Sequence, residues 1–162
     1  MQISSKQSLI GYYLTILMTM CLNILPLPDI LKGFNPDWVL LGLIYWVFAA
    51  PDRIGVFNAG VIGLFVDILT GRMLGQYALI YALVVYVCLK GHRRLSNYLM
   101  PQQMLFIFFC LLFSRILSSW IGNMQGYTVL FHVFLFPVLS GALIWPLLCY
   151  ILGYFFRFRR FG

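Results

Sequence analysis

The chain has 162 residues, of which 62% are hydrophobic, 18% are aromatic and only 9% are charged. A water-soluble domain of this length could not bury so much apolar surface, so the composition excludes a soluble globular fold and predicts one integral membrane domain over residues 1–162. Lipid cannot hydrogen-bond the backbone, and the apolar runs are not the roughly ten-residue alternating strands of a membrane barrel. The expected fold is therefore an all-α polytopic transmembrane bundle.

The apolar runs predict about six membrane-spanning helices in chain order. A bilayer crossing needs about 20 residues, and two of the predicted spans, 37–50 and 76–89, rise only about 21 Å each. These two must extend into the interface, sit against thinned bilayer or fail to cross fully. Residues 127–136 would make the last run too long, so they are expected to lie in the outer interface. The six spans are 8–25, 37–50, 54–70, 76–89, 103–121 and 137–156.

Turn residues and small residues mark how these runs are separated and packed. Proline and glycine punctuate the breaks after the first three runs, and the small residues Ala59, Gly60 and Gly63 would let the third run approach another helix closely. The break residues are Pro28 after the first run, Pro51 and Arg53 after the second, and Gly71 and Gly75 after the third.

The second run opens on Asn35-Pro36-Asp37-Trp38, which has the composition of a helix start. Asn35 is expected to be the N-cap, Pro36 the first helical residue and Asp37 a favourable charge at the positive end of the helix dipole. Trp38 and Trp120 are expected at the outer water interface, where indole rings are common.

The basic residues fall mainly in alternate breaks, which predicts the orientation. The side with more Lys and Arg faces the cytoplasm, so both termini are expected there. The clusters at 90–94 and 157–160 are expected to contact anionic lipid headgroups, not nucleic acid. The cytoplasmic set is Lys6, Arg53, Lys90, Arg93, Arg94, Arg157, Arg159 and Arg160, against Lys32 and Arg72 on the other side.

Two charged residues, Asp67 and Arg115, fall inside predicted spans at similar depths from the outer end. An unpaired charge in the bilayer is costly, so we hypothesise that they form a buried pair, or share a polar network with Thr70, Ser114 and Ser118. The pair would either register two helices or take part in binding or a proton relay. Depth alone does not decide between these roles.

The sequence offers no assembled catalytic or metal site. It has no Gly-x-Ser-x-Gly, no His-Glu-x-x-His and no Walker-type phosphate loop, so we expect no enzyme activity and no cofactor. The four cysteines lie far apart, each within or at the end of an apolar run, and are expected to be packing residues.

The residues from 26 to about 90 contain a series of motifs. They are Pro26-Leu-Pro-Asp29, then Phe34-Asn-Pro-Asp-Trp38 with Tyr45-Trp46, then Ala50-Pro51-Asp-Arg53, and finally Gly60-x-x-Gly63-x-x-x-Asp67-Ile-Leu-Thr-Gly71-Arg-Met-Leu74-Gly75. Together these motifs resemble the MreD family of bacterial rod-shape-determining proteins. Beyond residue 90 the likeness is one of length and hydropathy.

The resemblance implies a non-enzymatic scaffold subunit of the cell-elongation complex in the bacterial inner membrane. Such a protein works beside the bitopic protein MreC and near the MreB filament, a RodA-type glycosyltransferase and a class B penicillin-binding transpeptidase. The short loops leave mainly intramembrane surface for partners, so aromatic residues are candidate contacts with a partner or with lipid. These candidates are Tyr45, Trp46, Phe109, Phe131 and Trp145.

The same resemblance leaves a second function open. The family is similar in fold to the substrate-binding membrane subunits of energy-coupling-factor vitamin transporters, which have about six helices. Small-molecule capture would require convergent polar groups near the outer face. Asp67, Thr70, Arg115, Asn123 and Gln125 could supply them.

Overall fold

The described residues form an all-helical bundle. A computed structural model describes residues 5–24, 35–51, 54–71, 73–95, 99–124 and 131–158, with the helical backbone alone at 5–9, 24, 92–95, 131–134 and 155–158. Every predicted span corresponds to one helix, so the predicted fold class is confirmed. The helices are α1 (Ser5–Ile24), α3 (Trp38–Ala49), α4 (Val56–Thr70), α5 (Gln76–Leu95), α6 (Met100–Met124) and α7 (Phe131–Phe158).

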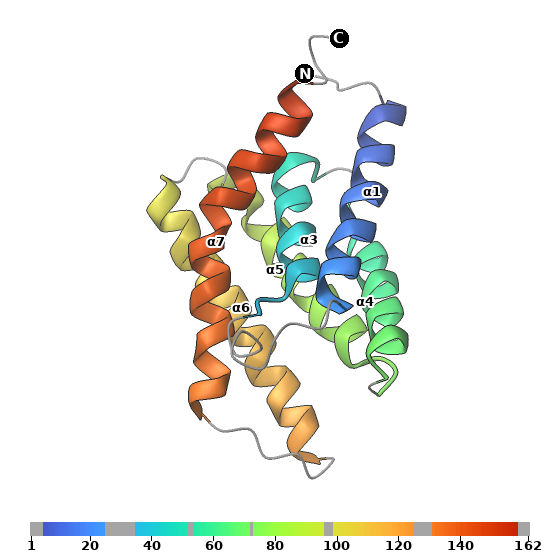
Figure 1. The fold of residues 1–162 in the computed structure, drawn as a ribbon, viewed down its shortest axis with the longest axis vertical. Helices are drawn as coiled ribbons and strands as arrows, with labels where there is room; N and C mark the ends of the chain where they lie inside the picture. The colour runs from blue at the N-terminus through green and yellow to red at the C-terminus, as the bar shows by residue number, and fades with distance from the viewer. Residues whose placement is uncertain are drawn as a thin grey trace.

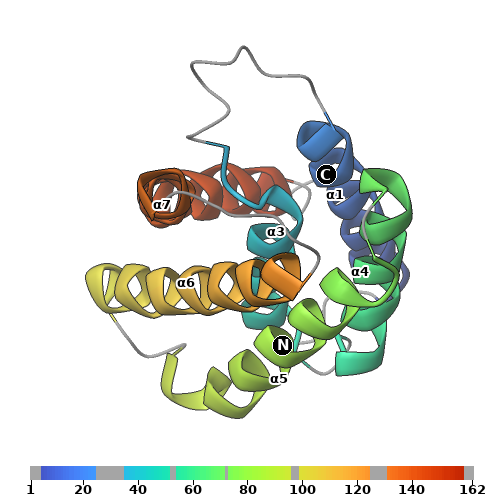
Figure 2. The ribbon, with the colours of Figure 1, turned by 90° about the horizontal axis from the view of Figure 1, so that it is seen from below.

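Helix α3 occupies the centre of the bundle. Helices α6 and α7 pack together on one side of it, and α1, α4 and α5 surround the other side (Figures 1 and 2). The most extensive contact joins α4 to α5, which are consecutive in the chain. Helix α1 begins and α7 ends at the same end of the bundle (Figure 1).

The short second span is explained by the burial of α3. Eight of its 12 residues are buried, among them Val39, Leu41 and Val47, and these cover all sides of the helix. A helix that is apolar all round is one that other elements enclose. Because protein surrounds most of α3, its length of about 18 Å does not have to match the thickness of the bilayer.

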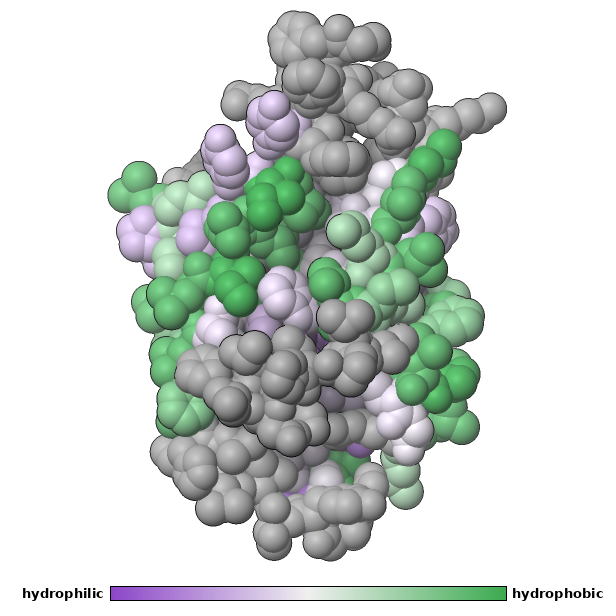
Figure 3. All heavy atoms as spheres, viewed as in Figure 1, coloured by the Kyte–Doolittle hydropathy of each residue, from purple (hydrophilic) through white to green (hydrophobic). Residues whose placement is uncertain are grey.

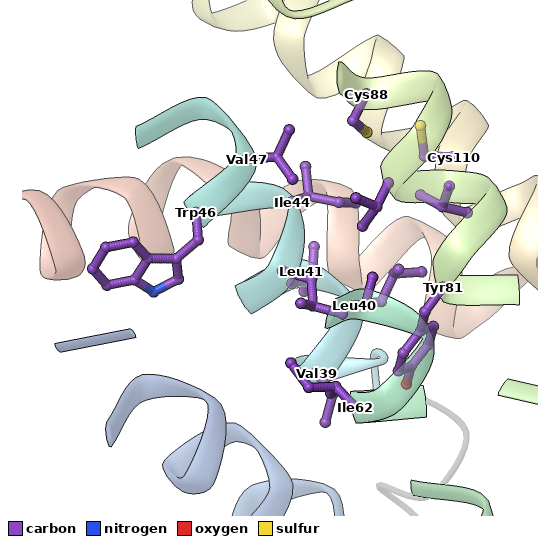
Figure 4. Packing of buried hydrophobic residues seen from close by; sticks show 14 of the residues in the cluster. Val39, Leu40, Leu41, Ile44, Trp46, Val47, Ile62, Tyr81, Cys88 and Cys110 are labelled. Atoms are coloured by element: carbon purple, nitrogen blue, oxygen red, sulfur yellow. The ribbon is translucent and has the colours of Figure 1, made fainter. Parts of the chain in front are cut away.

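The core extends from α3 to its neighbours. Leu40 and Ile44 of α3 lie near Tyr81 of α5 in the buried cluster, which also includes Cys88 of α5 and Cys110 of α6 (Figure 4). All four cysteines are free thiols. Cys88 and Cys110 are buried, in agreement with a packing role, whereas Cys149 is half-buried and Cys21 is exposed, so the packing prediction was wrong for Cys21.

Two predicted boundaries were wrong. The fourth span is a helix of 20 residues that runs through the basic stretch to Leu95, and cations near a helix C-terminus interact favourably with the helix dipole. Residues 131–136 are not a separate interfacial segment, because they form the first turns of α7, which continues for 28 residues with Pro137 and Pro146 inside it. Residues 127–130 lie outside the described residues.

The bundle exposes apolar surface suited to lipid. Helix α6 and residues Leu135–Tyr154 of α7 are long and apolar enough to cross a membrane, and the other four helices contain shorter apolar stretches. Large exposed side chains such as Phe57, Leu105 and Leu143 lie on the flanks, and Figure 3 shows apolar atoms over much of the visible sides of the bundle. This agrees with a helical membrane protein.

Candidate functional site

The glycine-rich stretch of the third run, from Gly60 to Gly75, lies at the contact between α4 and α5. Ala59 is fully buried, and Gly63 lies directly against the α5 backbone. A Cβ added to Gly63 would be 2.5 Å from the carbonyl oxygen of Tyr77 and 2.6 Å from the Cα of Ala78. Only glycine permits this approach, so the predicted small-residue contact is formed, and its partner is α5.

Asp67 lies one turn after Gly63 on the same face of α4, and its carboxylate caps α5. Its Oδ1 accepts a hydrogen bond from the backbone N–H of Tyr77 at 2.9 Å, and its Oδ2 accepts from those of Gly75 at 2.9 Å and Ala78 at 3.3 Å. The first N–H groups of a helix have no partner within the helix. The fully buried carboxylate supplies one and places a negative charge at the positive end of the α5 dipole.

Two glycines shape the turn that joins these helices. Gly71 ends α4 in the left-handed region, with a φ of 63°, and its N–H donates to the carbonyl oxygens of Asp67 and Ile68. Gly75 has a φ of 99° and donates its N–H to Asp67. Residues with a Cβ rarely adopt positive φ. Gly63, Asp67, Gly71 and Gly75 therefore cooperate to form one tight helical hairpin, which we call the α4–α5 hairpin.

The hairpin is joined to α6 by a buried side chain. Nε2 of Gln76 donates to the Oγ of Ser118 at 3.0 Å and approaches its carbonyl oxygen at 3.4 Å. Thr70 serves its own helix, because its hydroxyl donates to the carbonyl oxygen of Val66 at 2.7 Å. Ser118 therefore contacts the start of α5 through Gln76, and no hydrogen bond among the described residues joins it to Asp67.

A second polar group surrounds the start of α3. Asp37 is the N-cap of α3, and its Oδ1 accepts from the N–H of Leu40 at 3.2 Å. The hydroxyl of Tyr81 on α5 lies 2.8 Å from Oδ1 and 3.0 Å from Oδ2 of the same carboxylate. The helix begins at Trp38, so the prediction of Asn35 as N-cap and Pro36 as first helical residue was wrong.

Arg115 belongs to this second group. Its Nη2 approaches the carbonyl oxygen of Asn35 at 3.5 Å, and its charge interacts with that of Asp37. The side chain of Asn35 accepts a hydrogen bond of 2.8 Å from Nε1 of Trp38. We call Asn35, Asp37, Tyr81 and Arg115 the Asp37 cluster.

The segment before α3 is also held by close packing against α6 and α7. A Cβ at Gly141 of α7 would lie 2.6 Å from Cδ1 of Leu111 and 3.3 Å from the Cβ of Pro36. The absence of a side chain at Gly141 therefore makes room for both neighbours. Non-helical backbone at membrane depth is tolerated where protein covers it, and Pro36 is buried here.

The hypothesis of a direct Asp67–Arg115 pair is not supported by this geometry. Asp67 is hydrogen-bonded to the backbone of α5, whereas Arg115 faces Asn35 and Asp37. Two helices with charges at equal depth need not turn those charges toward each other. The local pattern around Asp37 predicts only the start of a helix and does not indicate that Arg115 faces it.

The aromatic candidates fall into two groups. Trp46 and Trp145 are 4% and 1% exposed, so their assignment to a lipid or partner surface was wrong. Both belong to the core: Trp46 contacts the rings of Tyr12 and Tyr45, and Trp145 contacts that of Phe48. Tyr45 is half-buried. Phe109 is 57% exposed on α6 and remains a candidate contact.

The remaining candidates are only partly described. Pro51 is half-buried in the turn after α3, and Lys90 is exposed at the end of α5, with its Nζ 5.9 Å from the ring centre of Tyr86. The helical backbone alone is described at Arg93, Arg94, Phe131 and Arg157. Pro28, Arg53, Arg159 and Arg160 lie outside the described residues. Within the part of the chain that is described, no three His, Cys, Asp or Glu residues gather into a metal site.

Comparison with known proteins gives one consistent result. A family model described as rod shape-determining protein MreD matches residues 5–159. A protein named "Rod shape-determining protein MreD" from Haemophilus influenzae is 27% identical over 126 residues, which cover 77% of this chain and 77% of that relative. No solved structure matches the chain.

Proposed function

Because the chain belongs to the MreD family of rod shape-determining proteins, we propose that it is a non-enzymatic scaffold of the cell-elongation complex. It would span the bacterial inner membrane several times, with both termini in the cytoplasm, and bind MreC. Through MreC it would influence the peptidoglycan-synthesising pair of a RodA-type glycosyltransferase and a class B penicillin-binding transpeptidase, and act near the MreB filament.

The observation that carries this proposal is the structural use of the family motif. The polar and glycine residues at positions 63, 67, 71 and 75 are used to close the α4–α5 hairpin. Residues that hold the helices of a bundle together favour a rigid scaffold. Such a scaffold would contact its partners through the exposed apolar faces of its helices.

Phe109 is the best of the aromatic candidates for such a contact. It lies in the middle of α6 in a stripe of exposed apolar side chains at intervals of three or four residues, which follows one face of the helix. A single transmembrane helix of a bitopic partner could lie along a stripe of this length. The stripe consists of Leu105, Phe109, Phe113, Ile116 and Trp120.

Small-molecule capture is the weaker alternative. Two of the groups that it would need are already engaged in local hydrogen bonds, because Asp67 caps α5 and Thr70 bonds to Val66. Arg115 lies with Asp37 instead, and Asn123 is exposed near the end of α6. These residues do not converge on one pocket.

The test is restoration of cell shape in a rod-shaped host depleted of its own family member. We expect the wild-type chain to restore rods and to co-purify with an MreC-like bitopic protein in mild detergent. Cells that stay round although the chain is present at normal levels, or co-purification with transport ATPases alone, would contradict the scaffold proposal.

The contact surface is tested by a photo-crosslinking residue placed at Phe109, with Phe57 on α4 as the matched position. Both side chains are exposed, at 57% and 86%, so lipid contact alone would treat them alike. We expect crosslinking to the bitopic partner from position 109 and not from position 57. Equal crosslinking from both positions would remove α6 as the specific contact.

A further inference from the structure

Arg115 is an unusual cation for its position in the membrane. Helix α6 rises about 37 Å against a hydrocarbon thickness of about 30 Å, so with α6 centred the Cα of Arg115 lies about 10 Å inside the edge at which α6 ends. Among the described residues, its only hydrogen bond is the 3.5 Å approach to Asn35, and it makes no ion pair. A guanidinium has five N–H donors, so the described residues leave most of its hydrogen-bonding capacity unused.

Asp37 has unused capacity of the opposite kind. A carboxylate can accept about four hydrogen bonds, whereas Asp37 receives those of Leu40 and Tyr81 and a backbone hydrogen bond from Val39 among the described residues. The charges of Asp37 and Arg115 interact, yet each keeps its own neutral partners. The cluster therefore presents one positive and one negative group side by side, both able to take a further partner.

The cluster retains a path to its surroundings. Asn35, Asp37 and Arg115 are each half-buried, so each of these residues keeps some accessible surface, whereas Tyr81 is fully buried. A polar residue that is accessible at the depth of Arg115 can be hydrogen-bonded by water, or by a lipid headgroup that is displaced toward the bilayer centre. Charged side chains inside membranes usually mark such a partner.

We propose that the Asp37 cluster binds the zwitterionic headgroup of a phospholipid that carries a phosphate and a primary ammonium, as in phosphatidylethanolamine. The phosphate accepts hydrogen bonds from Arg115, whose planar fork suits phosphate oxygens. The ammonium donates to Asp37. A purely anionic headgroup fits less well, because it would meet the Asp37 carboxylate without compensation.

This assignment predicts a specific order among lipids with identical acyl chains. Phosphatidylcholine has a phosphate but no N–H to donate to Asp37, and phosphatidylglycerol lacks the cation altogether. We expect the wild-type chain to bind phosphatidylethanolamine at least fivefold more tightly than either of them. Because the comparison uses wild-type protein, no variant has to fold for it to be decisive.

The experiment titrates the delipidated full-length chain in detergent with each of the three lipids and measures bound lipid by native mass spectrometry. Arg115→Gln should weaken phosphatidylethanolamine binding at least fivefold. Asp37→Asn, which retains an N-capping side chain, should reduce phosphatidylethanolamine to the level of phosphatidylcholine. Lys90→Gln, at an exposed basic residue of the other end of the bundle, should change nothing.

Three results of the titration with intact lipids would overturn the proposal. They are equal affinity of the wild-type chain for all three lipids, unchanged binding by a folded Arg115→Gln variant, and equal losses for Arg115→Gln and Lys90→Gln. Soluble glycerophosphoethanolamine distinguishes the source of the headgroup. If it binds as tightly as the intact lipid, the site takes a free zwitterion and the lipid assignment is wrong. Cell-shape restoration is measured separately, so either proposal can fail alone.

Discussion

Replacing Gly63 with Ala is expected to destabilise the α4–α5 hairpin. The added Cβ would lie 2.5 Å from the carbonyl oxygen of Tyr77 and 2.6 Å from both the Cα and the N of Ala78. These are backbone atoms of a helix, which cannot rotate away, so the two helices must separate. Overpacking of this kind costs about 1–3 kcal/mol, which corresponds to a decrease of about 5- to 150-fold in the folding equilibrium constant. The separation would also lengthen the hydrogen bonds of Asp67.

Gly60→Ala is the matched control for this prediction. Gly60 lies on the same helix, and its added Cβ would meet the carbonyl oxygen of Ala78 at 3.9 Å and the Cβ of Ala82 at 4.0 Å, which is ordinary contact. Both substitutions gain helix propensity of up to about 1 kcal/mol, so this contribution cancels between them. In a titration of detergent-solubilised protein with dodecyl sulfate, followed by circular dichroism and tryptophan fluorescence, Gly63→Ala should unfold earlier than wild type and Gly60→Ala should not. Identical unfolding of the two variants would refute the close-approach argument.

Three further predictions concern the hairpin and the orientation. Asp67→Ala removes the acceptor for three backbone N–H groups of the α5 start, and the loss of a capping side chain should cost about 0.5–2 kcal/mol in the same titration; an unchanged midpoint would contradict the capping role. Gly75→Ala forces a Cβ onto a φ of 99° and should cost about 1–3 kcal/mol, whereas Gly153→Ala, in open space on α7, should not destabilise the protein, because it only adds helix propensity. In a cysteine-free background, a membrane-impermeant thiol reagent should label Asn123→Cys on intact cells and Lys90→Cys only after permeabilisation, and the reverse pattern would invert the proposed orientation.

The helix positions could be predicted from the sequence because they depend on hydrophobicity along the chain. The described helices begin and end within a few residues of the predicted spans, except for the end of α5 and the start of α7. In both exceptions the helix continues through residues that a hydropathy criterion assigns to an interface. Helix α5 can continue through the basic residues after Leu89 because positive charges near a helix C-terminus interact favourably with the helix dipole. Residues 131–136 can form the start of α7 because a helix does not have to begin at the edge of the hydrocarbon.

The side-chain partners could be predicted only where helix periodicity points at a neighbour. Gly63 and Asp67 are four residues apart and share one face of α4, so the small-residue contact already indicated that Asp67 faces the same helix as Gly63. Pairing Asp67 with Arg115 used depth alone, which says nothing about the direction in which either side chain points. The contact of Arg115 with the start of α3 depends on how α6 is rotated. Rotation is set by packing such as that of Leu111 of α6 against Gly141 of α7, which no local pattern reveals.

The residues that form the α4–α5 hairpin and the surface that we propose for partner binding are different parts of this molecule. Gly63, Asp67, Gly71 and Gly75 are recognisable because glycine and a capping carboxylate meet backbone requirements that few residues can meet. A surface that meets another helix in lipid has no such requirement, since apolar side chains of several kinds can pack there and the hydrophobic effect does not distinguish a partner from lipid. These four residues therefore indicate that the α4–α5 hairpin forms. Binding of a partner has to be measured along exposed faces such as that of α6, where the sequence resembles any other lipid-facing helix.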